Sequence, residues 1–157
     1  MRECLGFIVL LLSSLAALCQ TPSSNWIIIK DSKAACQIAV PPDWAPLGEN
    51  NGAAIFRDPT NGIAVVTSQP GQQFKPLSAV QLKNIGVAKE KMFENSATRI
   101  FYQDKTATGP QDTNAFSSSA PGQDGTCSCH IVVLSTVPED IAKKIALSLS
   151  PVVKPDS

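Results

Sequence analysis

The residues best suited to chemistry in this 157-residue chain lie between Thr126 and Val137, in the run TCSCHIVVLSTV. Cys127, Cys129 and His130, which is the only histidine, fall within four positions. Thiolates and imidazole are good ligands for zinc and copper. Cys36, the other cysteine beyond the first nineteen residues, is a candidate fourth ligand. A thiol or metal site is therefore one hypothesis for this stretch.

The same run is also typical of a β-strand, and strand geometry separates these side chains. Successive side chains of a strand point to opposite faces, so Cys127 and Cys129 would share a face with Ile131, while His130 would lie on the other. Only a bulge at His130 would unite them, and the spacing is one residue short of the Cys-x-x-Cys-His haem-attachment pattern. We expect no metal and no cofactor, and keep Cys127, Cys129, His130 and Cys36 as the metal-binding alternative.

A structural disulfide is the other use of these cysteines. Three remain beyond the first nineteen residues, and an odd number allows one internal bond with one thiol left over. Cys127 and Cys129 are a poor pair, because residues i and i+2 of a strand lie about 6.6 Å apart with parallel Cβ vectors. Cys36 shares a predicted strand face with Ile38 and Val40, and is the better partner for either one. Such a bond would close a loop of about ninety residues and contribute roughly 4 kcal/mol.

A hydrolytic site is a third hypothesis, and the pattern supports it least. Ser128 would share the strand face of His130, and we find no acid placed to orient the imidazole ring as a catalytic triad requires. Six carboxylates fall at turns or strand ends, where they cap or solvate the backbone: Asp43, Glu49, Asp58, Asp104, Asp112 and Asp124. Phosphate loops and dinucleotide-binding or zinc-protease motifs are missing from the sequence. We predict no catalytic residue.

The first nineteen residues have the layout of a secretory signal peptide. Leu5–Leu18 is an apolar run of signal-peptide length, short for a bilayer span. Ala17 and Cys19 occupy the small-residue positions before a cleavage site, which leaves Gln20 as the mature N-terminus. The alternative is a lipoprotein acylated at Cys19, although Leu18 stands where such signals carry a small residue. We expect an exported protein, periplasmic or extracellular, or else anchored to the membrane through Cys19.

The charge balance excludes nucleic acid as a partner. Lys and Arg total 13, Asp and Glu total 13, and the net charge is zero, so there is no basic excess. Without residues 1–19 the chain has 157 − 19 = 138 residues, enough for one domain with a substantial core. No later apolar run has membrane-spanning length. The expected partner is a protein that the sequence does not specify.

Hydrophobic periodicity and turn residues predict seven strands and two helices in the order β-β-β-β-α-β-β-β-α. The strands are expected at Trp26–Ile29, Ala35–Val40, Ala53–Arg57, Ile63–Ser68, Thr98–Asp104, Thr113–Ser119 and Thr126–Thr136. One helix begins after Ser78, where Gln81 completes a capping box. It runs to about Glu94, with Gly86 inside it at a cost of about 1 kcal/mol. The other covers Val137–Leu149. Short links between strands favour an antiparallel sheet, so the class is α+β.

Several local sequences match one known layout. VPPDW stands at Val40–Trp44, FRDPTNGIAV at Phe56–Val65, a capped helix follows Ser78, and VPEDIAKKIALSL forms the last helix at Val137–Leu149. From about Cys36 to Val152 the chain resembles the PsbP-like superfamily. That fold occurs in a photosystem II extrinsic subunit, in a Ran-binding import factor and in many exported bacterial proteins. The resemblance implies an α/β/α sandwich: a mainly antiparallel sheet of about six to seven strands with two packed helices.

The resemblance also shapes the functional expectation. The family has no shared catalytic residues and its members mostly bind other proteins, so we transfer no functional residue. We divide the chain into a signal peptide (1–19), a leader with an opening strand (20–34), one domain (35–152) and a tail (153–157). We expect a non-enzymatic domain that binds a protein or serves a structural role at the cell envelope. The alternative is a thiol- or metal-handling protein that uses Cys127, Cys129 and His130.

Overall fold

The computed structural model describes residues 25–104 and 113–153. The predicted signal peptide with Cys19, the carboxylate Asp112 and most of the predicted tail lie outside these residues. Within them the strands are β1 (Ile27–Lys30), β2 (Cys36–Val40), β3 (Ala45–Asn50), β4 (Ala53–Arg57), β5 (Ile63–Pro70), β6 (Met92–Asn95), β7 (Ile100–Gln103), β8 (Thr113–Pro121), β9 (Gly125–Leu134) and β10 (Ser150–Pro151). The helices are α1 (Ala79–Ile85), the 3-10 helix η1 (Lys89–Lys91) and α2 (Glu139–Leu147).

Seven strands form one antiparallel sheet in the order β3-β4-β5-β9-β8-β7-β6. The two longest strands, β8 and β9, lie next to each other inside it. Strand β9, which contains the cysteines and the histidine, is bonded on both sides, to β5 and to β8. The α+β class and a mainly antiparallel sheet of about six to seven strands are confirmed. The strands predicted at Trp26–Ile29 and Ala35–Val40 correspond to β1 and β2 and lie in a separate small sheet, and β3 and β6 complete the seven.

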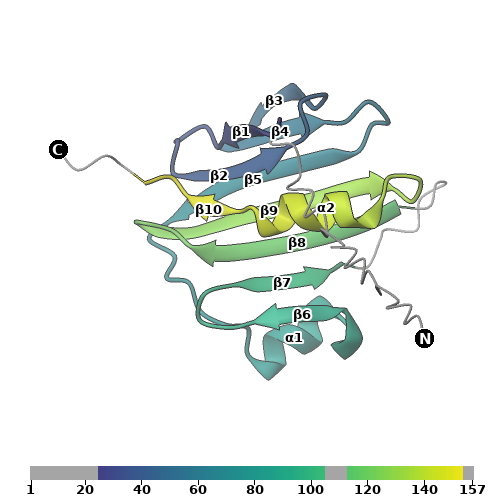
Figure 1. Cartoon of the computed structure of the whole chain (residues 1–157). Coiled ribbons are helices and arrows are strands. Elements are labelled where there is room, and N and C mark those ends of the chain that lie inside the picture. Colours follow the sequence, from purple (N-terminus) through teal and green to yellow (C-terminus); the bar gives the residue numbers. More distant parts are fainter. Residues whose placement is uncertain (1–24, 105–112, 154–157) are drawn as a thin grey trace, which may run out of the picture.

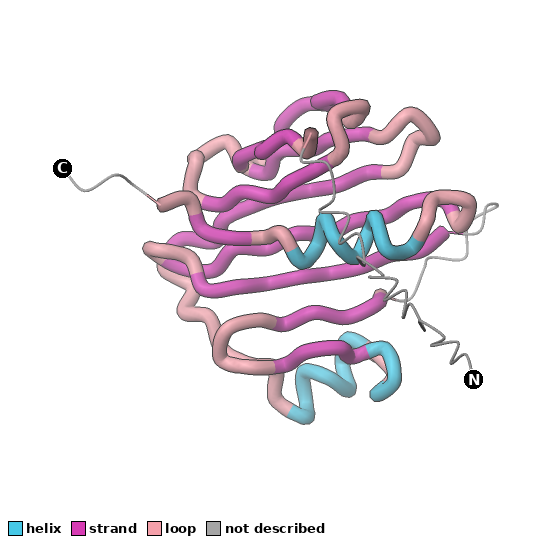
Figure 2. Tube along the Cα trace, viewed as in Figure 1, coloured by secondary structure: helices cyan, strands magenta, loops and turns pink. Residues whose placement is uncertain are grey.

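A second layer covers one face of this sheet (Figures 1 and 2). It consists of the small sheet β1-β2-β10 and of helix α2. The core between the layers is apolar; its fully buried side chains include Ile38, Val40, Val66, Phe116, Ile131, Val133, Ile145 and Leu149. The alternation expected for β2 and β9 is observed, because every second residue of both strands faces this core. Among the described residues no second sheet packs on the other face over β5, β8 and β9, which we call the open face, although the segment 71–78 lies over one end of it near Ser119 and Ser128.

Strand β3 was not predicted, and its composition explains why. All six residues are exposed, so it lacks the apolar alternation that marks a strand. Pro46 and Gly48 flank a register shift in its pairing with β4. These features are common on edge strands, where they discourage pairing with a second chain. The hairpin with β4 turns at Asn51 and Gly52, which have φ values of 50° and 85° as tight hairpins require.

Helix α1 is much shorter than predicted. Its capping box is present: the Ser78 hydroxyl accepts from the Gln81 backbone N–H, and the Gln81 side chain accepts from the Ser78 N–H. The helix ends at Gly86, which adopts a left-handed conformation with φ of 65° as a C-cap, and β6 then occupies part of the predicted helix. None of the α1 residues is buried. Of the two packed helices expected, only α2 lies on the described core.

The variant Gly86→Ala distinguishes a helix that ends at Gly86 from a helix that continues through it, because the change in the free energy of unfolding has opposite signs in the two cases. The observed cap needs positive φ, so alanine should lower the free energy of unfolding by about 1 kcal/mol. Had Gly86 been inside a longer helix, alanine would have raised it by a similar amount. Urea unfolding measures the difference, and Gly86→Asn, which tolerates positive φ better, should lose less than Gly86→Ala.

Candidate binding face of the large sheet

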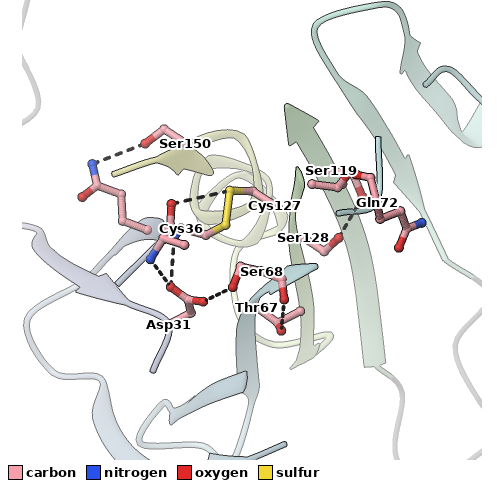
Figure 3. Close-up of a disulfide and its surroundings, with 12 residues drawn as sticks. Asp31, Cys36, Thr67, Ser68, Gln72, Ser119, Cys127, Ser128 and Ser150 are labelled. Carbon is pink, nitrogen blue, oxygen red and sulfur yellow. Dashed lines mark hydrogen bonds between the residues drawn. A yellow bond between two sulfur atoms is a disulfide. The ribbon is translucent and has the colours of Figure 1, made fainter. Parts of the chain in front are cut away.

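The structure uses two of the candidate cysteines to join its layers. Cys36 on β2 and Cys127 on β9 form a disulfide with a Cα–Cα distance of 5.6 Å and a sequence separation of 91 (Figure 3). The two strands are not hydrogen-bonded neighbours; β2 lies in the layer above β9. Cys129 is a buried free cysteine. Of the two pairings that the sequence left open, the one with Cys127 is observed.

Asp31 supports the β2 end of this bond, and sequence reasoning missed it. Its Oδ1 accepts from the backbone N–H groups of Ala35 (2.7 Å) and Cys36 (2.9 Å), and its Oδ2 accepts from the Ser68 hydroxyl (2.6 Å) (Figure 3). The carboxylate is buried and holds the β1–β2 turn against β5. The signal was an aspartate directly after an apolar strand, a position where side chains often accept from the following turn.

The four candidate metal ligands do not converge. Cys36 and Cys127 are bonded to each other, and His130 points to the opposite face of β9. Burial raises the pKa of the Cys129 thiol to about 12, so this sulfur is a poor nucleophile and a poor metal ligand at neutral pH. Within residues 25–104 and 113–153, no three or more His, Cys, Asp or Glu side chains gather as a metal site would need.

His130 instead belongs to a polar cluster on the open face. Its Nδ1 lies 2.8 Å from the Ser117 hydroxyl and 3.2 Å from Oδ2 of Asp104, and the Ser117 hydroxyl also donates to Asp104. Ser117 on β8 stands directly across from His130 on β9. The Asp104 N–H bonds to the Ala115 carbonyl, which extends the β7–β8 ladder and brings the carboxylate into place. Our expectation that no acid orients this histidine is therefore wrong.

This cluster is not the serine–histidine–acid arrangement of a hydrolase. In such a triad the acid holds one imidazole nitrogen and the serine bonds the other. Here Ser117 and Asp104 share Nδ1. Because Ser117 donates its hydrogen to the Asp104 carboxylate, Nδ1 must carry a hydrogen to bond Ser117, and the basic nitrogen is Nε2. Nε2 has no contact with the serine, so Ser117 is not activated as a nucleophile.

Two neighbouring pKa values respond to the cluster. Partial burial acts to raise the pKa of Asp104, but the hydrogen bonds from His130 and Ser117 and the charge of His130 outweigh it, so the net shift is downward. Tyr102 stands across from Ser117 on β7. Burial and the Asp104 charge raise the pKa of its phenol, and contact with Ser117 opposes them. The cluster therefore presents an ionised carboxylate and a neutral phenol at neutral pH.

The Asp104 shift predicts a specific acid sensitivity. Since the folded-state pKa is lower than the ordinary 3.8, the stabilisation is fully present above the ordinary value and is lost as the pH falls through the folded value. Melting temperatures measured from about pH 2 to 6 should therefore decline less steeply for Asp104→Asn than for the wild type. Asp43→Asn, at an exposed turn acid, is the control. If the melting temperatures of Asp104→Asn and wild type declined equally at acid pH, the stabilising role of the Asp104 carboxylate would be contradicted.

The rest of the open face divides into an apolar and a polar part. The apolar strip comprises Ile55, Ile63, Val65 and Val132 on β4, β5 and β9, all half-buried or exposed. The polar part adds Thr67, Ser119 and Ser128 to the His130 cluster. These side chains alternate with core residues on the same strands, so one periodic pattern produces both faces.

Solved structures resemble this chain in fold but share little of its sequence. A solution structure of a cyanobacterial PsbP (CyanoP) from Synechocystis sp. PCC 6803 matches with a TM-score of 0.52 at 9% identity, over 87% of this chain and 98% of that one. The fold is PsbP-like. A crystal structure of a protein from Bacteroides thetaiotaomicron matches with a TM-score of 0.52 at 14% identity over 81% of this chain, which spans 48% of that protein. No protein-family model and no curated protein matched the sequence.

The PsbP-like fold positions the open face without assigning it a ligand, since such a fold serves many functions. At these identities nothing is transferred residue by residue. In the described part of the chain no helix is long and apolar enough to cross a membrane. The candidate site therefore rests on the geometry of the open face itself.

Proposed function

We propose that this protein is an exported, non-enzymatic binding domain that attaches to a partner protein through the open face of its large sheet. A signal peptide at residues 1–19 would direct export and then be cleaved off, with acylation at Cys19 as the alternative. The observation that carries the proposal is the apolar strip beside the His130 cluster. An apolar area rimmed by polar groups is typical of a protein interface.

The cysteines support the exported location. Disulfides persist in oxidising compartments and are rare in the cytosol. The Cys36–Cys127 bond joins the two layers of the fold, which suits a protein that matures outside the cytosol. Mass spectrometry of the native protein under non-reducing conditions tests this: we expect one Cys36–Cys127 bond and no bound metal. Free thiols with stoichiometric zinc or copper would favour the metal-handling alternative instead.

The His130 cluster supports binding rather than turnover. Its imidazole is held at Nδ1 by Asp104 and Ser117, and the His130 side chain is 48% exposed. A rigidly held, half-exposed imidazole next to apolar side chains can donate or accept a hydrogen bond to a partner. Loss of a measurable hydrolytic activity in His130→Ala would contradict the non-enzymatic assignment.

Site-specific photo-crosslinking tests the interface directly. A photoreactive phenylalanine analogue replaces Ile63, which is 36% exposed on the open face, or Leu147, which is 39% exposed on α2 in the other layer. In cells that make the protein naturally, position 63 should yield one discrete crosslinked protein and position 147 should not. The crosslink should weaken when Val132→Asp is added. Equal yields from both positions, or a product from position 147 alone, would reject this interface.

A further inference from the structure

A trough lined by both polar and apolar side chains runs along the open face and ends beneath the segment 71–78. It consists of two hollows, of ≈ 210 Å³ beside His130 and ≈ 500 Å³ under that segment. Ser119 and Ser128 line both hollows, so the two adjoin each other. The apolar strip of the proposed interface touches the trough only at Val65.

The floor of the trough is a row of hydroxyl groups. Thr67, Ser128 and Ser119 stand side by side on β5, β9 and β8, in one register row, on strands about 4.8 Å apart. Their hydrogen bonds within the protein are long: 3.4 Å between Ser119 Oγ and Ser128 Oγ, and 3.4 Å from Thr67 Oγ1 to the Ser68 carbonyl (Figure 3). Bonds of that length are weak, so these hydroxyls retain donor and acceptor capacity for a ligand.

The wall is rich in amide side chains. Gln69, Gln72, Gln73 and Gln81 line the larger hollow, and each carboxamide can both donate and accept. The wall is fixed to the floor where the buried Thr126 hydroxyl donates to the Gln72 carbonyl at 2.7 Å. Gln72 and Gln73 are thus on a segment tied to the sheet, while Gln69 lies on β5 and Gln81 on α1, where its carboxamide oxygen accepts from the Ser78 N–H.

The trough carries little charge and has an aromatic ring in each hollow. Among its lining residues only Lys75 is permanently charged, and His130 is charged when protonated. Phe74 lines the larger hollow and Tyr102 the smaller one, both half-buried. A matching ligand is uncharged, presents many groups that both donate and accept hydrogen bonds, and has C–H faces that pack on aromatic rings. Sugar rings have these properties.

We propose that this trough binds a neutral oligosaccharide. An extended peptide fits it less well, because peptides are usually held by adding a strand at a sheet edge. The backbone groups of β5, β9 and β8 along the floor are already paired with neighbouring strands. A ligand is therefore recognised by side chains, and these combine hydroxyls and amides with aromatic and apolar groups. The trough shares Val65 and His130 with the proposed interface, but sugar binding needs no partner protein and would tether the domain to a glycan at the envelope.

Titration of the full chain with three neutral probes, chitohexaose, cellohexaose and maltohexaose, tests the proposal. In ¹⁵N NMR spectra at least one probe should cause saturable shifts confined to backbone amides of the trough, such as those of Gln72, Ser119 and Ser128. Failure of all three probes would overturn the proposal. So would shifts centred outside the trough, or saturation by an uncharged hexapeptide but by none of the sugars.

Single substitutions show where on the open face the sugar binds and distinguish this site from the proposed protein interface. Ser128→Ala and the isosteric Thr67→Val each remove one floor hydroxyl. Each should lower the affinity for the sugar that binds the wild type by about tenfold. Ser135→Ala, at an exposed serine outside the trough, should leave its affinity unchanged, as should the interface variant Ile63→Asp. Spectra of the free variants check that each is folded. Equal affinities of Ser128→Ala, Thr67→Val and wild type would overturn the proposal even if the interface is correct.

Discussion

Removing the disulfide, in the variant Cys36→Ala/Cys127→Ala, should lower the free energy of unfolding by about 4 kcal/mol. The bond spans a sequence separation of 91, and a crosslink that closes so long a loop removes much conformational entropy from the unfolded chain. Both cysteines are also buried in the core between the layers. This is a large share of the total stability of a domain of this size, about 5–15 kcal/mol.

Urea unfolding with and without dithiothreitol separates the crosslink from the loss of buried atoms. Cys129→Ala is the matched control, since it removes a buried sulfur from the same face of β9 and leaves the bond intact. The wild type and Cys129→Ala should lose stability on reduction, whereas the double variant should not respond. A wild-type midpoint that is the same under both conditions would refute the prediction, whether or not the double variant folds.

The faces of β9 could be predicted from the sequence because they depend only on local geometry. Alternation alone separates Cys127 and Cys129 from His130, and the structure has this separation. The choice between the two cysteines as partner of Cys36 could not be predicted. It depends on how the small sheet sits over the large one, which is a matter of packing between layers rather than of pairing between strands.

The partners of His130 were beyond sequence reasoning for a related reason. Asp104 lies 26 positions before His130 in the chain (130 − 104) and reaches it only across β8, once the registers of β7, β8 and β9 are set. No local pattern encodes those registers. The predicted length of helix α1 was wrong for a different reason. Gly86 was interpreted as a residue inside the helix that lowers its stability slightly, whereas it is the residue at which the helix ends.

The second large effect is expected at Asp31, where Asp31→Ala should lower the free energy of unfolding by about 3 kcal/mol. The buried carboxylate accepts three hydrogen bonds, and alanine would leave the N–H groups of Ala35 and Cys36 without that partner. Asp31→Asn retains one acceptor oxygen, and its amide can donate to the Ser68 hydroxyl, so it should lose only about 1 kcal/mol. Asp43→Ala, at an exposed acid, should stay within about 0.5 kcal/mol of wild type.

The energetic coupling between Asp31 and the disulfide provides a further test of this prediction. The Cys36 N–H that donates to Asp31 belongs to the residue whose sulfur bonds Cys127, so both interactions fix the same end of β2 on the large sheet. Their losses should therefore be less than additive, by about 1 kcal/mol, in a cycle that combines Asp31→Ala with Cys36→Ala/Cys127→Ala. Unfolding free energies of the four proteins measure it. Strict additivity would mean that Asp31 stabilises only its own turn and has no part in joining the layers.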